Sequence, residues 1–263
     1  MFSPRLATGI TLLVVVVSAL LFLPNRWWNV LLIPVLAGAS WEWSRLAHHT
    51  AGVRWVFCAL VPGSAIALWL GAGPETAAIL LAISCAFWFF IVPAWLVAHR
   101  RVQSGVALTL TGWIVLVPAW FALGRLQVQP AQLLALLAIV WLADTGAYAA
   151  GRAWGKHKLA ATISPGKTWE GVAGAAFAVA VYYAILSHAV PEWGWWANRR
   201  GMVLFAGVTF LSIMGDLFES WMKRQAGAKD SGTLLPGHGG ILDRVDSMTS
   251  SMPFAAAFLL YMN

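Results

Sequence analysis

The chain has 263 residues, of which 60% are hydrophobic and only 10% are charged, and its mean hydropathy is +0.74. Because soluble domains carry about 25% charged residues, this composition excludes a soluble globular protein and indicates an integral membrane protein. The net charge of +7 does not indicate nucleic-acid binding, since no basic segment is long enough for it. Positively charged cytoplasmic loops and anionic lipid headgroups explain the excess.

Apolar segments of about 20 residues, enough to cross a bilayer, follow one another along the chain. We therefore expect an all-α polytopic membrane protein with about nine transmembrane helices and a polar cavity on its cytoplasmic side. The nine expected spans are Leu6–Leu23, Trp27–Trp41, Trp55–Gly71, Thr76–Ala98, Val106–Gly124, Ala131–Ala150, Trp169–His188, Gly201–Ser220 and Met248–Met262. The second and ninth are short. We interpret the first as a span and not as a signal peptide, because no small-residue cleavage site follows it.

The cations alternate with these spans and predict the orientation. One side of the membrane receives thirteen of them, Arg5, Arg45, Arg54, Arg100, Arg101, Arg152, Lys156, Lys158, Lys167, Lys223, Arg224, Lys229 and Arg244. The other side receives four, Arg26, Arg125, Arg199 and Arg200. Cytoplasmic loops are richer in Lys and Arg, so we expect the N-terminus and both long polar loops to be cytoplasmic.

The acidic residues are concentrated in the second half of the chain. Seven of the ten lie between residues 144 and 246, namely Asp144, Glu170, Asp216, Glu219, Asp230, Asp243 and Asp246. We interpret the others, Glu42, Glu75 and Glu192, as solvated residues of loops or helix ends. A carboxylate within a span is costly and normally faces a polar cavity that serves function. Asp144 and Asp216 are such residues, and a buried structural hydrogen bond is the alternative.

The eighth span carries Asp216, Glu219, Ser220, Lys223 and Arg224 at helical spacings of three and four, so they share one face. Carboxylates at its membrane end suit a metal ion such as Mg²⁺, and cations toward the cytoplasm suit phosphate. The alternative is a set of intrahelical ion pairs, of which Glu219–Lys223 is one candidate.

A second polar cluster follows this span. Lys229-Asp230 and Asp243-Arg244-Val245-Asp246 flank the run Pro236-Gly237-His238-Gly239-Gly240. Gly239 and Gly240 suit a tight turn that presents backbone N–H groups to an anion. His238 is either a structural residue or a base.

The loop after the sixth span contains Ser164-Pro165-Gly166-Lys167-Thr168. Ser followed by Pro is typical of a helix start, so we expect Ser164 as N-cap and Pro165 at the first helical position. The N–H groups of that first turn, with Gly166 and Lys167, then predict a phosphate-binding site. A Walker A motif is excluded, because Ala161 stands where a glycine is needed and no strand precedes it.

At these residues the sequence resembles the phosphatidate cytidylyltransferase (CDP-diacylglycerol synthase) family. The family's motif is matched by Ser220, Met222, Lys223, Arg224, Lys229, Asp230, Gly232, Leu235, Pro236, His238, Gly239, Gly240, Ile241, Asp243, Arg244, Val245 and Asp246. The segments Ala143–Tyr148 and Ser164–Gly171 also resemble the family, whereas before residue 130 only the hydropathy does.

The resemblance implies an inner-membrane enzyme, often dimeric, that converts CTP and phosphatidate to CDP-diacylglycerol and pyrophosphate with Mg²⁺, with or without a second cation. We accordingly expect one domain over residues 1–263, with lipid-facing helices in 1–130 and a catalytic half in 131–263. A homodimer in a bacterial-type inner membrane is expected.

From the resemblance and the positions of the acids we assign metal binding to Asp216 and to Asp243 or Asp246. Asp144 is expected as a further ligand or cavity acid. The expected phosphate clamp is Lys167, Lys223, Arg224, Lys229 and Arg244, with a hydrogen bond from Ser220, and Asp230 is also placed in the site. The competing functions are a transporter or flippase for an anionic substrate, and a family member with a scaffolding role or another lipid phosphate as acceptor.

Overall fold

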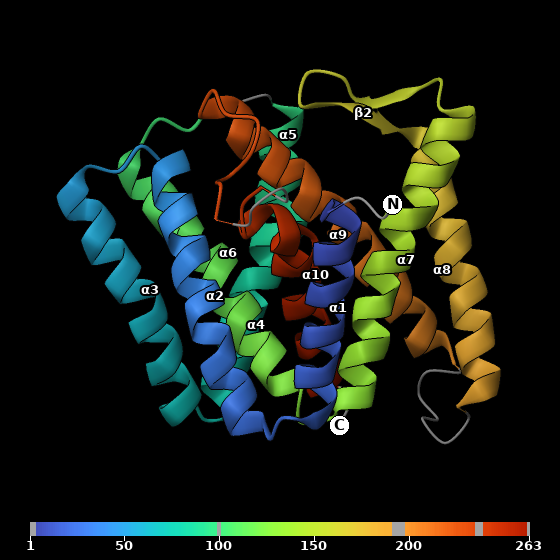
Figure 1. Ribbon diagram of the computed structural model, residues 1–263, viewed down its shortest axis with the longest axis horizontal. Helices are drawn as coiled ribbons and strands as arrows, with labels where there is room; N and C mark the ends of the chain where they lie inside the picture. The colour runs from blue at the N-terminus through green and yellow to red at the C-terminus, as the bar shows by residue number, and fades with distance from the viewer. Residues whose placement is uncertain (1–3, 99–100, 191–197, 235–238, 262–263) are drawn as a thin grey trace.

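A computed structural model describes residues 4–98, 101–190, 198–234 and 239–261, without the side chains of residues 4–10 and 12. The prediction of an all-α protein is confirmed, apart from one short hairpin (Figure 1). The helices are α1 (Pro4–Phe22), α2 (Asn25–Leu46), α3 (Ala51–Gly71), α4 (Pro74–Ala86), the π-helix η1 (Phe87–Ile91), α5 (Val92–Val97), α6 (Gly105–Leu126), α7 (Pro130–Trp154), α8 (Trp169–Ala189), α9 (Arg199–Gln225) and α10 (Leu242–Leu260). The hairpin consists of β1 (Lys158–Ala160) and β2 (Ser164–Thr168).

Within the described residues, six helical segments are long and apolar enough to cross a membrane. They are Ala51–Gly71, Pro74–Val97, Gly105–Leu126, Pro130–Trp154, Trp169–Ala189 and Arg199–Gln225, and they coincide with the third to eighth expected spans. That α1, α2 and α10 also cross the membrane stays a prediction. The second expected span, Trp27–Trp41, was predicted to be short. Helix α2 is longer than that, because it continues five residues beyond Trp41, as far as Leu46.

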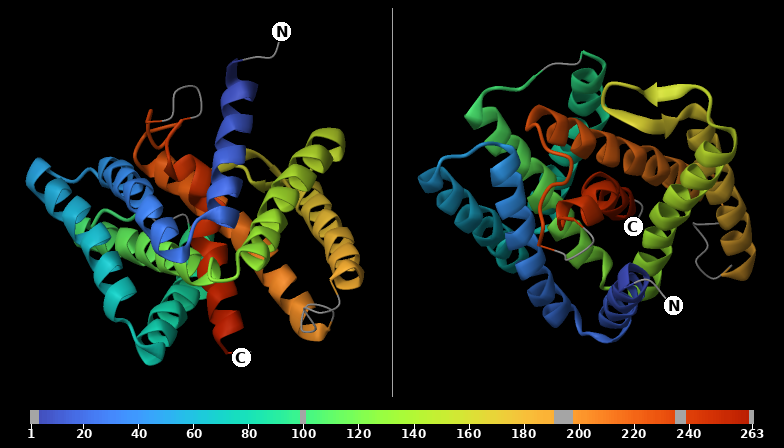
Figure 2. Two further views of the ribbon diagram at one scale, coloured as in Figure 1. Left: turned by 60° about the horizontal axis from the view of Figure 1, so that its bottom comes forward. Right: turned by 45° about the horizontal axis from the view of Figure 1, so that its top comes forward.

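Helix α10 lies in the middle of the bundle, in contact with α2, α4, α6, α7 and α9 (Figure 2). Most of its buried residues are small or hydroxylated, with Leu242 and Met252 as larger exceptions, and Ser250 and Ser251 are fully buried. Ser250 Oγ donates to Leu211 O on α9 at 2.6 Å, and Gly215 leaves room for the α10 backbone at Asp246. Because protein surrounds α10, it does not need the apolar surface of a helix that faces lipid. The helices of the first half, α2, α4 and α6, thus pack directly on the helix that carries Asp243 and Asp246.

Helices α7 and α8 form a close pair. A Cβ on Gly146 would come within 2.6 Å of the Gly174 carbonyl oxygen, so only glycine permits this approach. The antiparallel hairpin β1–β2 connects the two helices. Figure 1 shows it beside the ends of α7 and α9.

The expected helix start at Ser164 is wrong. Residues Ser164–Thr168 form β2, and α8 begins at Trp169. Thr168 is the N-cap, since its Oγ1 accepts a hydrogen bond from Gly171 N at 3.1 Å. Thr168 can occupy the cap because strand pairing keeps the Ser-Pro-Gly segment extended. The phosphate-binding turn predicted at Ser164 is therefore a strand and not a helix N-terminus.

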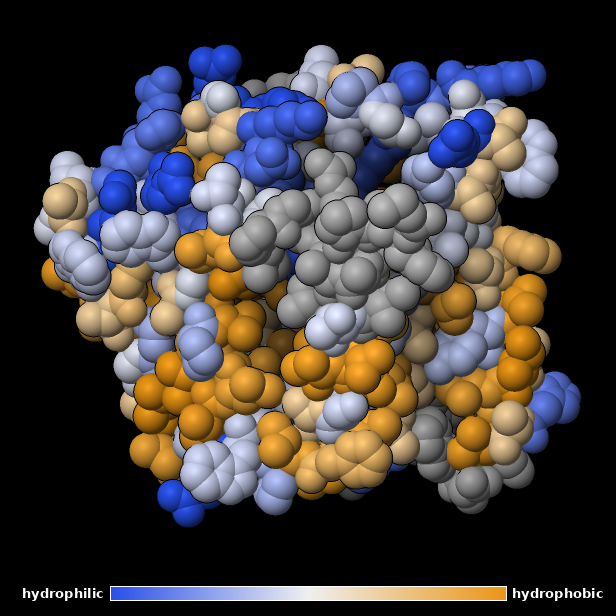
Figure 3. All heavy atoms as spheres, in the orientation of Figure 1, coloured by the Kyte–Doolittle hydropathy of each residue, from blue (hydrophilic) through white to orange (hydrophobic). Residues whose placement is uncertain are grey.

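Polar residues gather at one end of the molecule. In Figure 3 hydrophilic atoms lie along the upper end, near the hairpin, and hydrophobic atoms form a band below them. The chain connects α7 to α8 and α9 to α10 at this polar end. The residues singled out by the sequence therefore lie on adjoining segments.

Candidate active site

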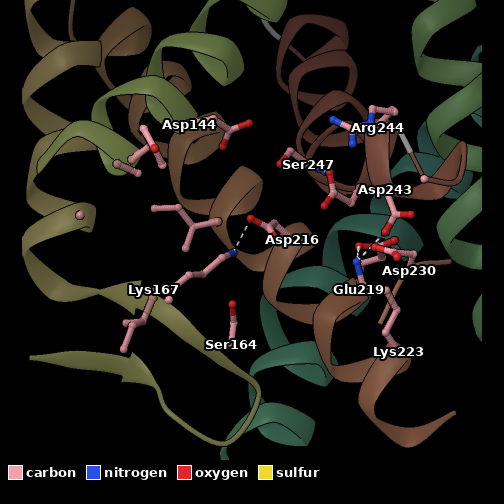
Figure 4. A pocket seen from close by; sticks show the side chains of 18 of the residues that line it. Asp144, Ser164, Lys167, Asp216, Glu219, Lys223, Asp230, Asp243, Arg244 and Ser247 are labelled. Atoms are coloured by element: carbon pink, nitrogen blue, oxygen red, sulfur yellow. Dashed lines mark hydrogen bonds and ion pairs between the residues drawn. The ribbon is translucent and has the colours of Figure 1, made fainter. Parts of the chain in front are cut away.

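A cavity of about 1130 Å³ opens between α7, α9, α10, the hairpin and the loop after α9 (Figure 4). This volume lies slightly above the usual range for a small-molecule site. Six acidic and four basic side chains line it, giving a formal charge of −2. These are Asp144, Asp216, Glu219, Asp230, Asp243, Asp246, Lys167, Lys223, Lys229 and Arg244. Ser164, Gly166 and Gly239 line it as well.

Lys167 reaches from β2 to α9. Its Nζ lies 2.6 Å from Asp216 Oδ2, and the two side chains are 22% and 36% exposed. The pair is therefore reachable from the cavity and yet partly shielded from water. Strand β2, and not the expected helix terminus, thus carries Lys167 and places it beside Asp216.

Three carboxyls from three helices share this part of the cavity, Asp144 on α7, Asp216 on α9 and Asp246 on α10. They are close enough for Asp216 to act electrostatically on both of the others. Asp144 has no hydrogen-bond or ion-pair partner in the described part of the chain. Among the described residues, the one hydrogen bond to Asp246 comes from the N–H of its neighbour Ser247, which lies 2.7 Å from Oδ1. Asp144 and Asp246 therefore keep most of their lone pairs available.

Lys223 lies between two carboxylates. Its Nζ is 2.6 Å from Glu219 Oε2, one helical turn away, and 2.6 Å from Asp243 Oδ1 on α10. The Glu219–Lys223 pair, which was the alternative to a phosphate-binding role for Lys223, is thus present. Because Lys223 pairs with a carboxyl group on each helix, it ties α9 to α10 and carries little excess charge into the cavity.

Asp243 is satisfied by protein donors at both oxygens. Oδ1 accepts from Lys223, and Oδ2 accepts from Ser231 N at 3.0 Å and Gly240 N at 2.8 Å. Asp243 lies in the first turn of α10, before the expected span. Burial raises the pKa of its carboxyl, but these donors outweigh the burial and lower the pKa to about 2. Asp243 is therefore ionised at physiological pH and holds the loop between α9 and α10.

The glycine run has a different role from the one expected. Gly239 adopts φ +82°, which glycine tolerates best, and the residues before it in the expected turn lie outside the described part of the chain. The N–H of Gly240, however, donates to Asp243, and Gly240 is not among the cavity-lining residues. His238 lies outside the described residues.

Two further expected site residues on α9 do not face the cavity. Ser220 and Arg224 are absent from its lining, whereas Asp216, Glu219 and Lys223 are present. Arg224 Nε instead donates to Ile163 O in the hairpin turn, at 3.3 Å. The predicted face of α9 is thus narrower than its helical spacing suggested, because the hairpin covers one edge of it.

The interpretation of Glu42 as a solvated residue is wrong. Its side chain is fully buried in α2 and accepts hydrogen bonds from Ile241 N at 3.0 Å and Leu242 N at 2.9 Å. The sequence held one signal for it, since Glu42 interrupts an otherwise apolar stretch. Ending the expected span at Trp41 placed Glu42 outside the membrane and removed that signal.

The carboxylates of the cavity are possible ligands of a metal ion. Among the described residues, no three His, Cys, Asp or Glu side chains converge as a preformed metal site. Mg²⁺ commonly binds through one or two carboxylates, with water and substrate phosphates as the remaining ligands. The carboxylate oxygens of Asp216, Asp246 and Asp144, and the cavity charge of −2, fit that mode.

Comparison with known proteins decides the family. Residues 3–262 match the cytidylyltransferase family model. The chain belongs to the cytidylyltransferase family. It is 35% identical to a phosphatidate cytidylyltransferase of Pseudomonas aeruginosa, covering 98% of this chain and 97% of that protein. It is 31% identical to a phosphatidate cytidylyltransferase of Haemophilus influenzae, covering 99% of each.

The family predicted from the C-terminal motifs is thereby confirmed. The match also includes the first 130 residues, where hydropathy alone had supported the resemblance. As a cytidylyltransferase, the chain must accommodate a nucleoside triphosphate and an acceptor, and the cavity at the polar end has the size and the charged groups for that task.

Proposed function

We propose that this cytidylyltransferase transfers CMP from CTP to phosphatidate and releases pyrophosphate, giving CDP-diacylglycerol for phospholipid synthesis. The observation that carries the proposal is the cavity between α7, α9 and α10, in a chain that aligns over nearly its full length with phosphatidate cytidylyltransferases. Its carboxylates and lysines stand side by side, as chemistry between two phosphates requires.

The reaction needs no protein nucleophile. A phosphate oxygen of phosphatidate forms a bond to the α-phosphorus of CTP, while the bond from that phosphorus to the bridging oxygen of the β-phosphate breaks. Pyrophosphate leaves with the electron pair. The barrier lies in bringing two polyanions together and in stabilising the transferring group. The protein therefore has to position and neutralise its substrates.

The cations of the cavity perform this positioning. Lys167 is partly exposed and held by one carboxylate only, so a phosphate can compete with Asp216 for it. Lys229 lies exposed at the cavity rim, where a triphosphate arriving from water meets it first. Arg244, on the first turn of α10, also lines the cavity. We assign these three to the phosphates, and Lys223 to holding α9 and α10 together.

The metal assignment rests on which carboxylates remain available. Asp243 has protein donors at both oxygens, whereas Asp246 and Asp144 have few and Asp216 has one lysine. We therefore propose that Asp216 and Asp246 hold Mg²⁺, with Asp144 as a further ligand. When bound, Mg²⁺ would neutralise phosphate charge and polarise the reacting phosphoryl group. The binding of a second cation in the cavity remains a prediction.

The membrane arrangement supports the same proposal. Cations favour the cytoplasmic side, so we place the polar end of the molecule there. CTP then enters from water while the acyl chains of phosphatidate stay in lipid. The homodimer implied by the family resemblance remains a prediction.

The test is a reconstitution with purified protein. Labelled CTP is supplied with phosphatidate or another lipid phosphate, with Mg²⁺ or with EDTA. We expect CDP-lipid and pyrophosphate in equal amounts, with phosphatidate as the preferred acceptor, and no product in EDTA. A different preferred acceptor would contradict the substrate assignment. Movement of a labelled anionic lipid across vesicles without CTP consumption would favour the transporter instead.

A further inference from the structure

Glu42 is a buried carboxyl for which the proposed reaction has no use. It lies in the N-terminal half of the chain, and its side chain is 0% exposed. Among the described residues, its hydrogen-bond donors lie in residues 231–234 and 239–242, here called the cavity loop. Ile241 N donates to Oε1 at 3.0 Å, while Leu242 N and Ser231 Oγ reach Oε2 at 2.9 Å and 3.0 Å.

The loop is shaped around this carboxyl. A Cβ on Gly232 would overlap the Glu42 carboxyl, and a Cβ on Gly240 would overlap both Ser231 Oγ and Glu42. One turn earlier on α2, a Cβ on Gly38 would overlap the Ile241 side chain. Glycine at these positions lets α2 and the cavity loop approach closely. The close packing of α2 against the cavity loop therefore depends on glycine at these three positions.

Asp243 accepts hydrogen bonds from the same loop. Its Oδ2 accepts from Ser231 N and Gly240 N, so both carboxyls act on the two ends of the loop. Ser231 Oγ lies between them, 3.0 Å from Glu42 Oε2 and 2.9 Å from Asp243 Oδ2. Its single proton serves one carboxyl at a time.

The loop that Glu42 and Asp243 hold in place forms part of the cavity wall. Lys229 and Asp230 come directly before Ser231, and Gly232, Thr233 and Gly239 belong to the loop itself; all five line the cavity. A buried carboxyl is costly unless hydrogen bonds compensate for it. An apolar residue would pack α2 against α10 at lower cost, so the carboxyl serves the geometry of the loop.

We infer that Glu42 is a positioning residue, which fixes the cavity loop so that Lys229 meets the triphosphate of CTP. The inference rests on the proposed function for the identity of the ligand. Glu42 itself touches no substrate. Its loss should therefore raise the KM for CTP more than the KM for phosphatidate, since the loop is held at the water-facing rim.

The first experiment is the variant Glu42→Gln, which keeps the shape of the side chain. One oxygen becomes an NH₂ group that faces N–H donors, so at least one of the three contacts is lost. We expect the KM for CTP to rise about tenfold, as for a lost hydrogen bond to a charged group. Hydrogen exchange at the Ile241 and Leu242 amides should accelerate, while exchange in α6 stays unchanged. The matched control is Glu75→Gln, an exposed residue in the first turn of α4.

The second experiment covers the case in which Glu42→Gln does not fold. Gly232→Ala drives a methyl group against the intact carboxyl, and Glu42→Asp withdraws that carboxyl by one methylene. If the two residues act through one contact, the double variant Gly232→Ala/Glu42→Asp should be less impaired than the product of the single effects. Multiplicative losses would contradict the inference.

Unchanged exchange at Ile241 and Leu242 in Glu42→Gln would overturn the inference, and so would an unchanged KM for CTP in an active enzyme. Failure of the wild-type protein to use CTP would refute the proposed function instead. In that case the exchange measurement alone decides whether Glu42 holds the loop.

Discussion

Two groups of carboxyls lie in or beside the cavity, and their surroundings differ. In the group that holds the cavity loop, Glu42 and Asp243 have protein donors at both of their oxygens. In the other group, Asp246 accepts one bond from its neighbour, and Asp144 has no partner in the described part of the chain. Since satisfied carboxyls stabilise structure and unsatisfied ones remain available to ligands, the comparison separates positioning residues from metal-binding candidates.

The largest expected effect is that of Asp246→Asn. Losing a metal ligand should cost several kcal/mol of transition-state stabilisation, which corresponds to a decrease in kcat of about 10³-fold. The one hydrogen bond that the described residues give Asp246 comes from Ser247 N, and an amide oxygen also accepts it. The thermal unfolding midpoint in detergent should therefore not fall. Near-normal turnover of Asp246→Asn would remove Asp246 from the metal site.

Asp243→Asn should behave differently from Asp246→Asn, because Asp243 belongs to the group that holds the cavity loop. This change leaves Lys223 with one carboxylate and weakens the contacts with Ser231 and Gly240. Breaking a buried ion pair costs about 3 kcal/mol, so activity and the unfolding midpoint should fall together. If Asp243→Asn lost activity with an unchanged midpoint, Asp243 would belong to the metal-binding group, as one alternative of the sequence hypothesis holds.

Lys167→Ala tests the cation that joins the hairpin to the acids. Truncating a partly shielded charge should cost about 10²-fold in the KM for CTP, with a smaller change in kcat. The matched control is Lys158→Ala, an exposed lysine of β1 that is not among the cavity-lining residues. Similar kinetics for the two variants would show that net charge, and not the place of Lys167, matters.

Much of this arrangement could be predicted from local sequence signals. Hydropathy located the helical segments, and the cost of an intramembrane charge pointed to Asp144 and Asp216. Helical spacing predicted the Glu219–Lys223 pair, because its two members lie one turn apart. Each of these inferences depends on neighbours within a few residues.

The predictions were wrong where residues far apart in the sequence determine the local structure. Glu42 is buried by donors that lie 189 to 200 residues further along the chain, which no local pattern encodes. Ser164-Pro165 has the composition of a helix start, but pairing with β1 and the cap at Thr168 make the segment a strand. The exclusion of Arg224 from the cavity likewise depends on where the hairpin packs.

The smallest expected effect separates the cavity lining from the family motif. Ser220 belongs to that motif but does not line the cavity, whereas Ser164 lines it beside Lys167. Ser220→Ala should therefore change kcat and both KM values by less than about twofold, as expected for a substitution away from the reacting groups. Ser164→Ala removes a hydroxyl within the cavity and should raise the KM for CTP by about fivefold, as for one lost hydrogen bond. A larger loss in Ser220→Ala than in Ser164→Ala would mean that the working cavity includes the hairpin-covered edge of α9. The hairpin would then have to move when substrates bind.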